Sequence, residues 1–177
     1  WLLVGLDKYP QALDTALAIA EHRDQLVFVP ATRSIRIHGL DIPLADTPFF
    51  YFYWYALWRL RSDEGWYTNP AQNRPDQTNS HTLHALFGKY GGHAKAASEL
   101  QEKGLRAKTL DQNRSKIKEE LGRHIGEELA HPYLFDVQRD ARTARFKYRI
   151  SLAPEFIQVE PDDLKLFCEH DAPELVI

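Results

Sequence analysis

The stretch "YLFDVQRDARTARFKYRISL", residues Tyr133–Leu152, decides the fold of this chain. Two apolar, strand-like runs flank the polar segment "QRDARTA", which has the composition of a turn. In the second run every other residue is apolar, namely Phe146, Tyr148, Ile150 and Leu152. The residues between them are basic or polar. This period of two predicts a β-hairpin with an apolar inner face and a basic outer face.

A helix is predicted directly before this hairpin. In "LDQNRSKIKEELG", Leu110–Gly122, the apolar residues Leu110, Ile117 and Leu121 fall seven and four positions apart. At about 100° per residue they form a narrow stripe on one side of a helix, which should face the core. The opposite side carries Gln112, Ser115, Lys116 and Glu119, with Arg114 and Lys118 on its flanks.

The segments upstream predict further elements. "SIRIHGLDIPL" alternates apolar and polar residues around Gly39, which predicts another hairpin. In "DTPFFYFYWYALWRLRSDEG" aromatic propensity favours a strand. However, Thr47 is a good N-cap and Pro48 suits a first helical position, so we predict a helix buried on most sides. "YTNPAQNRPDQTNS" predicts a loop, and two helices separated at Gly91 and Gly92 should follow.

Together these elements predict an α+β fold. From residue 34 the order is hairpin, three helices and hairpin, the last helix starting near Thr109 or Asp111 and continuing towards Leu129. A helix followed by a hairpin with a basic tip is the layout of a winged helix-turn-helix. The N-terminal β-hairpin matches the group that includes response-regulator output domains. We therefore predict three parts: residues 1–30, a partial Rossmann-like βαβ segment or linker; residues 31–153, a winged-helix domain with a C-terminal wing; and residues 154–177, an acidic tail.

Composition limits the class of protein. The single cysteine, Cys168, excludes an internal disulfide framework and fits a reducing cytoplasm, where we expect this chain. No apolar run approaches the roughly 20 residues that span a bilayer, so no membrane association is expected. The chain begins with Trp1 and contains no methionine. We therefore expect a processed protein or a piece of a longer one.

Charge is distributed unevenly along the chain. Its formal net charge is −3, yet Lys103–Arg123 holds seven Lys and Arg residues against three acids. Arg139–Arg149 holds five against one, whereas seven acids and one lysine occur from Glu155 to the end. Basic segments of this kind are the usual electrostatic feature of phosphate binding. The alternative is a solvated surface without a ligand.

The motifs in these segments resemble a known family. The stretch from Asp111 to Ile157 is similar to the C-terminal end of a CRISPR-associated family, whose members pair a Rossmann-like CARF sensor domain with a winged helix. The matching residues are Ser115-Lys116-Ile117, Leu121-Gly122, Leu129-Ala130, Pro132-Tyr133-Leu134 and Arg145 to Ile157, and "IPLADTPF" also fits. The resemblance implies antiviral defence and transcription regulation. Ring nuclease cleavage of cyclic oligoadenylate would belong to the CARF domain. The first 30 residues are too few for one, so we expect no enzymatic activity and no cofactor here.

DNA is the expected partner of a winged helix. The predicted helix contacts are Gln112, Arg114, Ser115, Lys116 and Lys118. The predicted wing contacts to phosphate are Arg139, Arg142, Arg145 and Lys147. Asp111, Glu119 and Glu120 argue against this hypothesis, because each would lie near phosphate. The alternative is an interaction module that forms a homodimer or docks a partner without nucleic acid.

Other kinds of site have little support. His81 and His84 share a helix face with His93 nearby, but the spacing of a zinc site is missing, so no metal is expected. "GGHAKAA" resembles a phosphoesterase motif without the aspartates that such enzymes need, and a helix–helix turn explains it better. Cys168 lies among acids that disfavour its thiolate. The aromatic run after Pro48 could stack on bases, but consecutive aromatics on a helix must mostly face a core.

Overall fold

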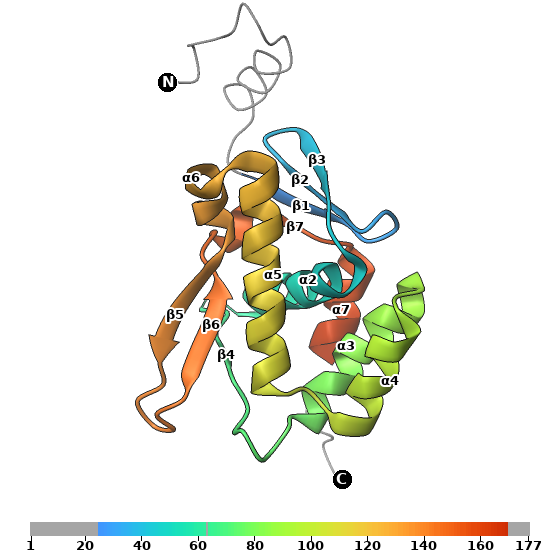
Figure 1. Cartoon of the computed structure of the whole chain (residues 1–177), viewed down its shortest axis with the longest axis vertical. Helices are drawn as coiled ribbons and strands as arrows, with labels where there is room; N and C mark the ends of the chain where they lie inside the picture. The colour runs from blue at the N-terminus through green and yellow to red at the C-terminus, as the bar shows by residue number, and fades with distance from the viewer. Residues whose placement is uncertain (1–24, 63, 170–177) are drawn as a thin grey trace, which may run out of the picture.

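The computed structural model describes residues 25–62 and 64–169, which form an α+β fold with six helices and two small sheets (Figure 1). The strands are β1 Leu26–Val29, β2 Ser34–Ile37, β3 Leu40–Pro43, β4 Tyr67–Thr68, β5 Phe135–Arg139, β6 Phe146–Ile150 and β7 Ile157–Gln158. The helices are α2 Asp46–Arg61, α3 Gln77–Tyr90, α4 Ala94–Lys103, α5 Ala107–Ile125, α6 Glu127–Ala130 and α7 Pro161–Glu169. Two 3-10 turns, His131–Tyr133 and Pro154–Phe156, complete the described chain.

The first sheet has the order β3-β2-β1-β7. Strands β2 and β3 form the predicted hairpin around Gly39, whose φ is +73°. The sheet also joins distant segments, since β7 lies parallel to β1 and α7 packs against α2. The chain from residue 154 to Glu169, expected as a tail, therefore contributes a strand and a helix to the body. The first strand and helix of the predicted βαβ segment lie outside the described residues.

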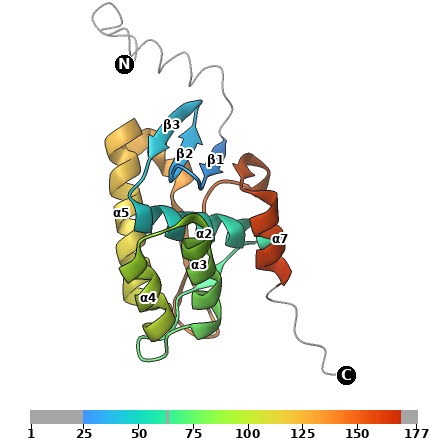
Figure 2. The same ribbon diagram turned by 90° about the vertical axis from the view of Figure 1, so that its right-hand side faces the viewer.

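Helix α2 crosses the centre of the molecule, between the first sheet and helices α3 and α4 (Figure 2). Eleven of its 16 residues are buried, so the predicted helix buried on most sides is confirmed. The predicted cap differs, because Ala45 occupies the N-cap position without a side-chain hydrogen bond and Thr47 lies in the first turn. The backbone N–H of Ala45 instead donates to the Glu120 carboxylate at 2.9 Å. A carboxylate of α5 thus accepts a hydrogen bond from the backbone N–H of the residue that precedes α2.

The two helices predicted around Gly91 and Gly92 are confirmed as α3 and α4. Gly91 has a left-handed conformation with a φ of +68°, which closes α3. At Gly92 a Cβ atom would lie 2.5 Å from the Phe87 ring, so a larger residue would clash. The predicted loop before α3 is shorter than expected. It includes β4, and Asp76 caps α3 by accepting a 2.9 Å hydrogen bond from the Asn79 N–H.

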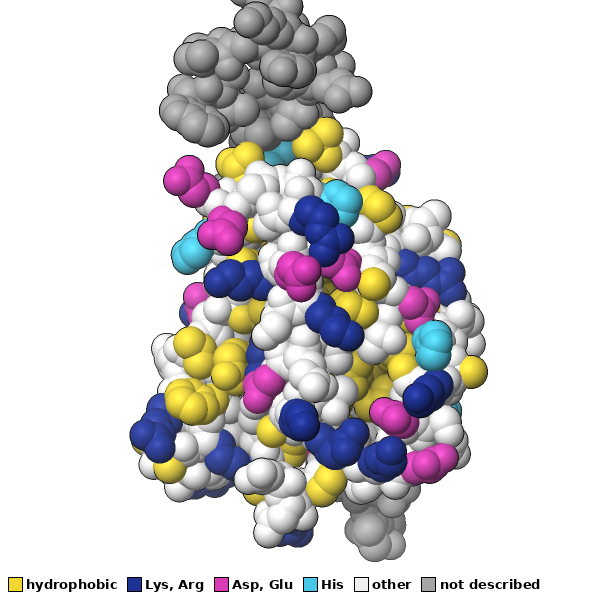
Figure 3. All heavy atoms as spheres, in the orientation of Figure 1, with side chains coloured by type: hydrophobic (Ala, Val, Ile, Leu, Met, Phe, Trp, Pro, Cys, Tyr) yellow, Lys and Arg dark blue, Asp and Glu magenta, His cyan; other side chains and the backbone are white. Residues whose placement is uncertain are grey.

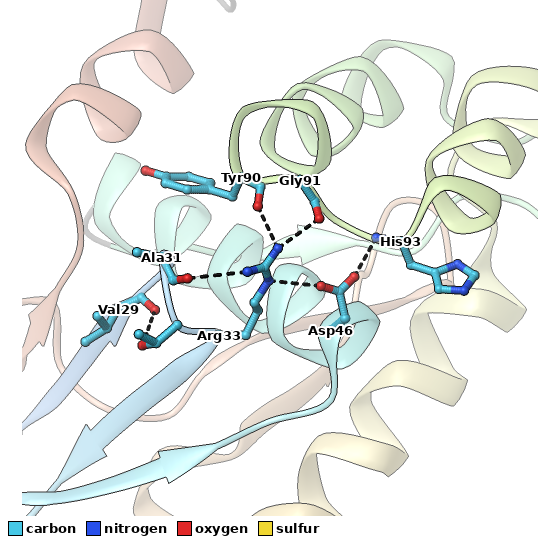
Figure 4. Close-up of polar contacts among 8 residues, drawn as sticks. Val29, Ala31, Arg33, Asp46, Tyr90, Gly91 and His93 are labelled. Carbon is cyan, nitrogen blue, oxygen red and sulfur yellow. Dashed lines mark hydrogen bonds and ion pairs between the residues drawn. The ribbon is translucent and has the colours of Figure 1, made fainter.

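Arg33 joins the first sheet to the helices (Figure 4). Its guanidinium donates to the carbonyl oxygens of Tyr90, at 2.6 Å, and Gly91, at 2.8 Å, where α3 ends. The same group forms a 3.1 Å ion pair with Asp46, whose other oxygen accepts from the His93 N–H at 2.6 Å. One arginine therefore satisfies carbonyls at the end of α3 and fixes α2 beside it.

Helix α5 runs along the body beside the second sheet, which has the order β4-β6-β5 (Figure 1). It begins at Ala107, before the predicted Thr109 or Asp111, and stops at Ile125 because Gly126, with a φ of +84°, breaks the helix. The short helix α6 then covers part of the span towards Leu129. Strands β5 and β6 form the predicted antiparallel hairpin, with Arg139 opposite Phe146 at its tip.

Among residues 25–62 and 64–169, no helix has both the length and the apolar character needed to cross a membrane.

Candidate nucleic-acid interface

The two sides of helix α5 differ sharply in burial. Leu110, Ile117 and Leu121 are fully buried, and the helix packs against α2 through them, as the sequence predicted. The opposite side is exposed and carries the predicted contacts Gln112, Ser115 and Lys116, together with Glu119. Two further exposed cations, Lys108 and Arg123, lie on the same side near its ends. We call these six residues the outer stripe: Lys108, Gln112, Ser115, Lys116, Glu119 and Arg123.

Lys108 and Arg123 were not among the residues predicted from the sequence. At about 100° per residue both lie within about 40° of Gln112, so the same helical periodicity could have found them. The outer stripe therefore has three cations and one acid. Figure 3 shows Lys and Arg side chains over α5 and along the lower part of this face, with acidic side chains among them.

Arg114 does not join the outer stripe. Only 7% of its surface is exposed, and its guanidinium donates to the Tyr55 hydroxyl, the Asp111 carboxylate and, at 3.4 Å, the Asn69 side chain. It also lies over the Tyr148 ring, 3.5 Å from the ring centroid. This predicted DNA contact is instead an internal link between α5, α2 and the hairpin.

Lys118 lies at the edge of a groove between α5 and the β5–β6 hairpin. The groove has a volume of about 550 Å³. Its wall includes Ser115, Lys118 and Glu127 from the helical side and Phe135 and Tyr148 from the hairpin. Lys116 and Lys118 form no ion pair with any described residue. Both ammonium groups are therefore available to an anion that approaches α5 from outside.

The three acids that argued against phosphate binding have different surroundings. Asp111 pairs with Arg114 and also accepts from the Asn69 amide at 3.2 Å. Glu120 accepts the Ala45 N–H described above. Glu119 alone lies on the outer stripe, where it pairs with Arg123 at 3.2 Å. Two of the three carboxylates are thus occupied by contacts within the fold.

The four predicted phosphate contacts fall into two pairs with different surroundings on the hairpin. Arg139 donates to the Ala144 carbonyl at 3.0 Å, and Arg142 is exposed in the turn at the tip. Arg145 donates to the Asn69 carbonyl at 2.9 Å, and the Lys147 ammonium lies 4.9 Å from the centre of the Trp66 ring. Arg139 and Arg142 therefore form the exposed basic tip, whereas Arg145 and Lys147 contact the segment around β4.

Asp140 organises the turn of the hairpin. Its carboxylate accepts from the Thr143 hydroxyl at 2.6 Å and from the Arg142 N–H at 3.0 Å. These hydrogen bonds, the one from Thr143 first, hold the pKa of Asp140 below its ordinary value. The acid within the basic segment is thus engaged with its own turn and fixes the backbone from which Arg142 projects.

The histidines considered as metal ligands and the cysteine lie on other elements than α5 and the β5–β6 hairpin. His81 and His84 lie on α3, and His93 precedes α4. In the described part of the chain, no three His, Cys, Asp or Glu side chains are grouped as metal ligands. Cys168 is exposed on α7. The aromatic residues of α2 from Phe49 to Tyr55 are buried, so they cannot stack on a nucleic acid in this structure.

Comparisons with protein-family models, with curated proteins and with solved structures find no match to this chain.

Proposed function

We propose that this chain is a winged-helix domain that binds duplex DNA through the outer stripe of α5 and the tip of the β5–β6 hairpin. The order of elements supports the proposal: a small sheet, helix α2, further helices ending in α5, and then a two-stranded hairpin. In this group of proteins a helix enters the major groove while neighbouring elements contact the backbone. Strand β4 extends the hairpin into a sheet, and β6 packs against α2.

The observation that carries the proposal is the composition of the outer stripe. Apart from Glu119, its exposed side chains are one amide, one hydroxyl and three cations, types that contact base edges and phosphates. Asp111 and Glu120, which would repel DNA, are each engaged by a partner of the same chain, Arg114 and the Ala45 N–H, although the Asp111 side chain is 55% exposed. Arg139 and Arg142 add cations at the hairpin tip. A solvated surface without a ligand would not require that Asp111 and Glu120 have partners while cations stay exposed.

Titration of duplex DNA at several salt concentrations tests the proposal. Lys116→Glu combined with Arg142→Glu should abolish binding, because both changes place carboxylates near phosphate. In the unchanged chain the logarithm of affinity should fall with that of salt, with a slope near −0.9 for each phosphate contact. The matched control, Lys165→Glu with Arg36→Glu, makes the same change in charge on α7 and β2 and should bind as the unchanged chain does. The absence of duplex binding at low salt, or an equal loss in the control, would refute the proposal.

A second candidate function is protein docking through the hairpin. Val137 and Phe146 are 55% and 52% exposed, which is high for large apolar side chains. They lie towards the tip on one face of the hairpin, where Arg139 also reaches over the Phe146 ring at 5.9 Å. If this candidate is correct, Val137→Lys should lower the molar mass in solution from dimer to monomer. DNA binding would then be absent at any salt concentration.

The resemblance to CARF-containing proteins suggests a wider role, which stays a proposal. In that role the winged helix is the non-catalytic output part of a CRISPR-associated protein, and cyclic oligoadenylate acts on a sensor domain elsewhere. The test is incubation of this chain with cyclic tetra-adenylate. Intact messenger is the expected result, and cleavage by this chain alone would contradict the assignment of catalysis to the sensor domain.

A further inference from the structure

The position of Glu119 within the outer stripe is unusual for a surface that binds phosphate. The exposed residues follow one another along α5 as Lys108, Gln112, Lys116, Glu119 and Arg123. Glu119 is therefore flanked by cations on both sides, and 73% of its side chain is exposed. A carboxylate here would face the DNA if the proposed function is correct, and the inference below rests on that function.

An acid at such a place weakens phosphate binding unless it accepts hydrogen bonds from the DNA. Its partner Arg123 holds it only through an exposed (i, i+4) ion pair, at 3.2 Å. Pairs of this kind contribute little to stability and can be exchanged for another contact. Glu119 differs in this respect from Asp111, whose partner Arg114 is buried, and from Glu120, which accepts a backbone N–H of a distant segment.

The spacing of the stripe fits the edges of consecutive base pairs. Gln112 and Glu119 are separated by about 10.5 Å along the helix axis, at 1.5 Å per residue. That length corresponds to about three base-pair steps of 3.4 Å. In the major groove a glutamine suits adenine, a lysine suits guanine, and a glutamate accepts from the N4 amino group of cytosine. Gln112, Lys116 and Glu119 supply one side chain of each kind.

We infer that Glu119 determines sequence specificity by accepting a hydrogen bond from a cytosine amino group in the major groove. The energetic cost of a carboxylate near phosphates is offset only where that cytosine is present. The chain should therefore discriminate among DNA sequences, and its site should contain one position that requires cytosine. Lys108 and Arg123 supply attraction to the backbone around that position.

Selection from a pool of randomised duplexes tests this inference. The unchanged chain should enrich cytosine at one position and prefer it about 10-fold or more over other bases. Glu119→Ala, which removes the acceptor, should lose that preference and bind unrelated duplexes more tightly at low salt, because one negative charge is also removed. The matched control Glu128→Ala, which removes a charge on α6 outside the stripe, should retain the preference.

Replacing the selected cytosine by N4-methylcytosine makes the test specific to the atom concerned. The methyl group removes one amino hydrogen, so it should weaken binding by the unchanged chain and have little effect on Glu119→Ala. An unchanged motif in Glu119→Ala, with equal gains for all duplexes, would show that Glu119 is only a repulsive surface acid. Duplex binding without preference at any position would overturn this inference alone. If the unchanged chain binds no duplex, the proposed function fails and this inference fails with it.

Discussion

Helices α2 and α5 are the two longest helices in the described chain and pack against each other, yet they present opposite surfaces. Helix α2 is buried on almost every side, by Phe28 of the first sheet, by β6 and by α3, α5 and α7. Helix α5 is buried on one side and exposes the outer stripe on the other. The comparison shows that α2 organises the core, whereas α5 connects that core to the surface where a partner would bind.

The difference extends to single residues. Arg114 of α5 points inwards and donates to the hydroxyl of Tyr55 on α2. Lys116, two residues after Arg114 on the same helix, is exposed. Two cations with the same predicted role thus differ completely in surroundings. Substitutions on the α2 side should change stability, and substitutions on the outer stripe should change binding.

The largest expected effect is loss of the whole fold at alkaline pH. Burial, before any other cause, raises the pKa of Tyr51, Tyr53 and Tyr55 on α2. Burial likewise raises the pKa of Tyr67, and that of Tyr90 to about 12. In the unfolded chain these groups ionise near pH 10. Above that pH the unfolded state binds fewer protons than the native state, so stability falls as pH rises towards and beyond 12.

Two optical signals measure this effect. Tyrosinate absorbance of the buried tyrosines should rise together with the loss of near-ultraviolet circular dichroism, in one cooperative transition. Ionisation of all eight tyrosines near pH 10 with the fold intact would contradict the burial of the α2 side. Lys116→Ala, on the outer stripe, should leave the transition unchanged.

A cavity in α2 should have the next largest effect. Trp54 is fully buried, its ring centroid lies 4.8 Å from that of Tyr67, and its indole N–H donates to the Thr82 hydroxyl at 3.2 Å. Trp54→Ala should lower the free energy of unfolding by about 3–5 kcal/mol, measured by chemical denaturation. Trp54→Phe should lower the free energy of unfolding by less, because phenylalanine still fills part of the space. A loss below about 1 kcal/mol for the alanine variant would show that α2 is less central than described.

Arg114→Ala should lower the free energy of unfolding less than Trp54→Ala does, but far more than Lys116→Ala does. Arg114→Ala leaves the Tyr55 hydroxyl and the Asn69 oxygen without this donor and removes a cation from the Tyr148 ring. Together these losses should cost about 3 kcal/mol. Arg114→Lys should recover little, since an ammonium lacks the planar fork that contacts several partners at once. Lys116→Ala should change stability by less than about 0.5 kcal/mol. Equal costs for Arg114→Ala and Lys116→Ala would contradict the inward placement of Arg114.

The sequence predicts those features that depend on neighbouring residues. Periods of two and of 3.6 residues located the two hairpins and the buried face of α5, because alternation and helical spacing are local properties. The stop between α3 and α4 followed from Gly91 and Gly92 in the same way. For α2, the capping signal and the length of the segment correctly predicted a helix against the aromatic propensity for a strand. The predicted N-cap, Thr47, lies two residues after the observed one, Ala45. Ala45 has no side-chain oxygen to act as a cap, and its own N–H is accepted by Glu120, a contact with a residue far away in the sequence.

Features that depend on distant residues were not predicted. Arg114 lies on the flank of the predicted polar face, and its inward direction follows from Tyr55, Asn69 and Tyr148, which are far from it in sequence. The pairing of β7 with β1 joins residues at opposite ends of the described chain, and the acidic composition there suggested only a tail. Charge composition likewise could not distinguish Asp111 and Glu120, which are engaged, from Glu119, which faces outwards.

The smallest expected effect concerns Ser115 on the outer stripe. Its hydroxyl donates to the Asp111 carbonyl of the same helix at 3.0 Å, a contact that competes with the backbone and slightly destabilises a helix. Alanine has a higher helix propensity than serine, so Ser115→Ala should raise the free energy of unfolding by up to about 0.5 kcal/mol. If the outer stripe contacts DNA, the same change should weaken duplex binding, measured by titration beside thermal unfolding. A gain in stability with a loss of affinity would indicate that binding, rather than folding, accounts for serine at this position. A gain in stability with unchanged affinity would place Ser115 outside the contact surface and narrow the interface on α5 to the other five residues of the outer stripe.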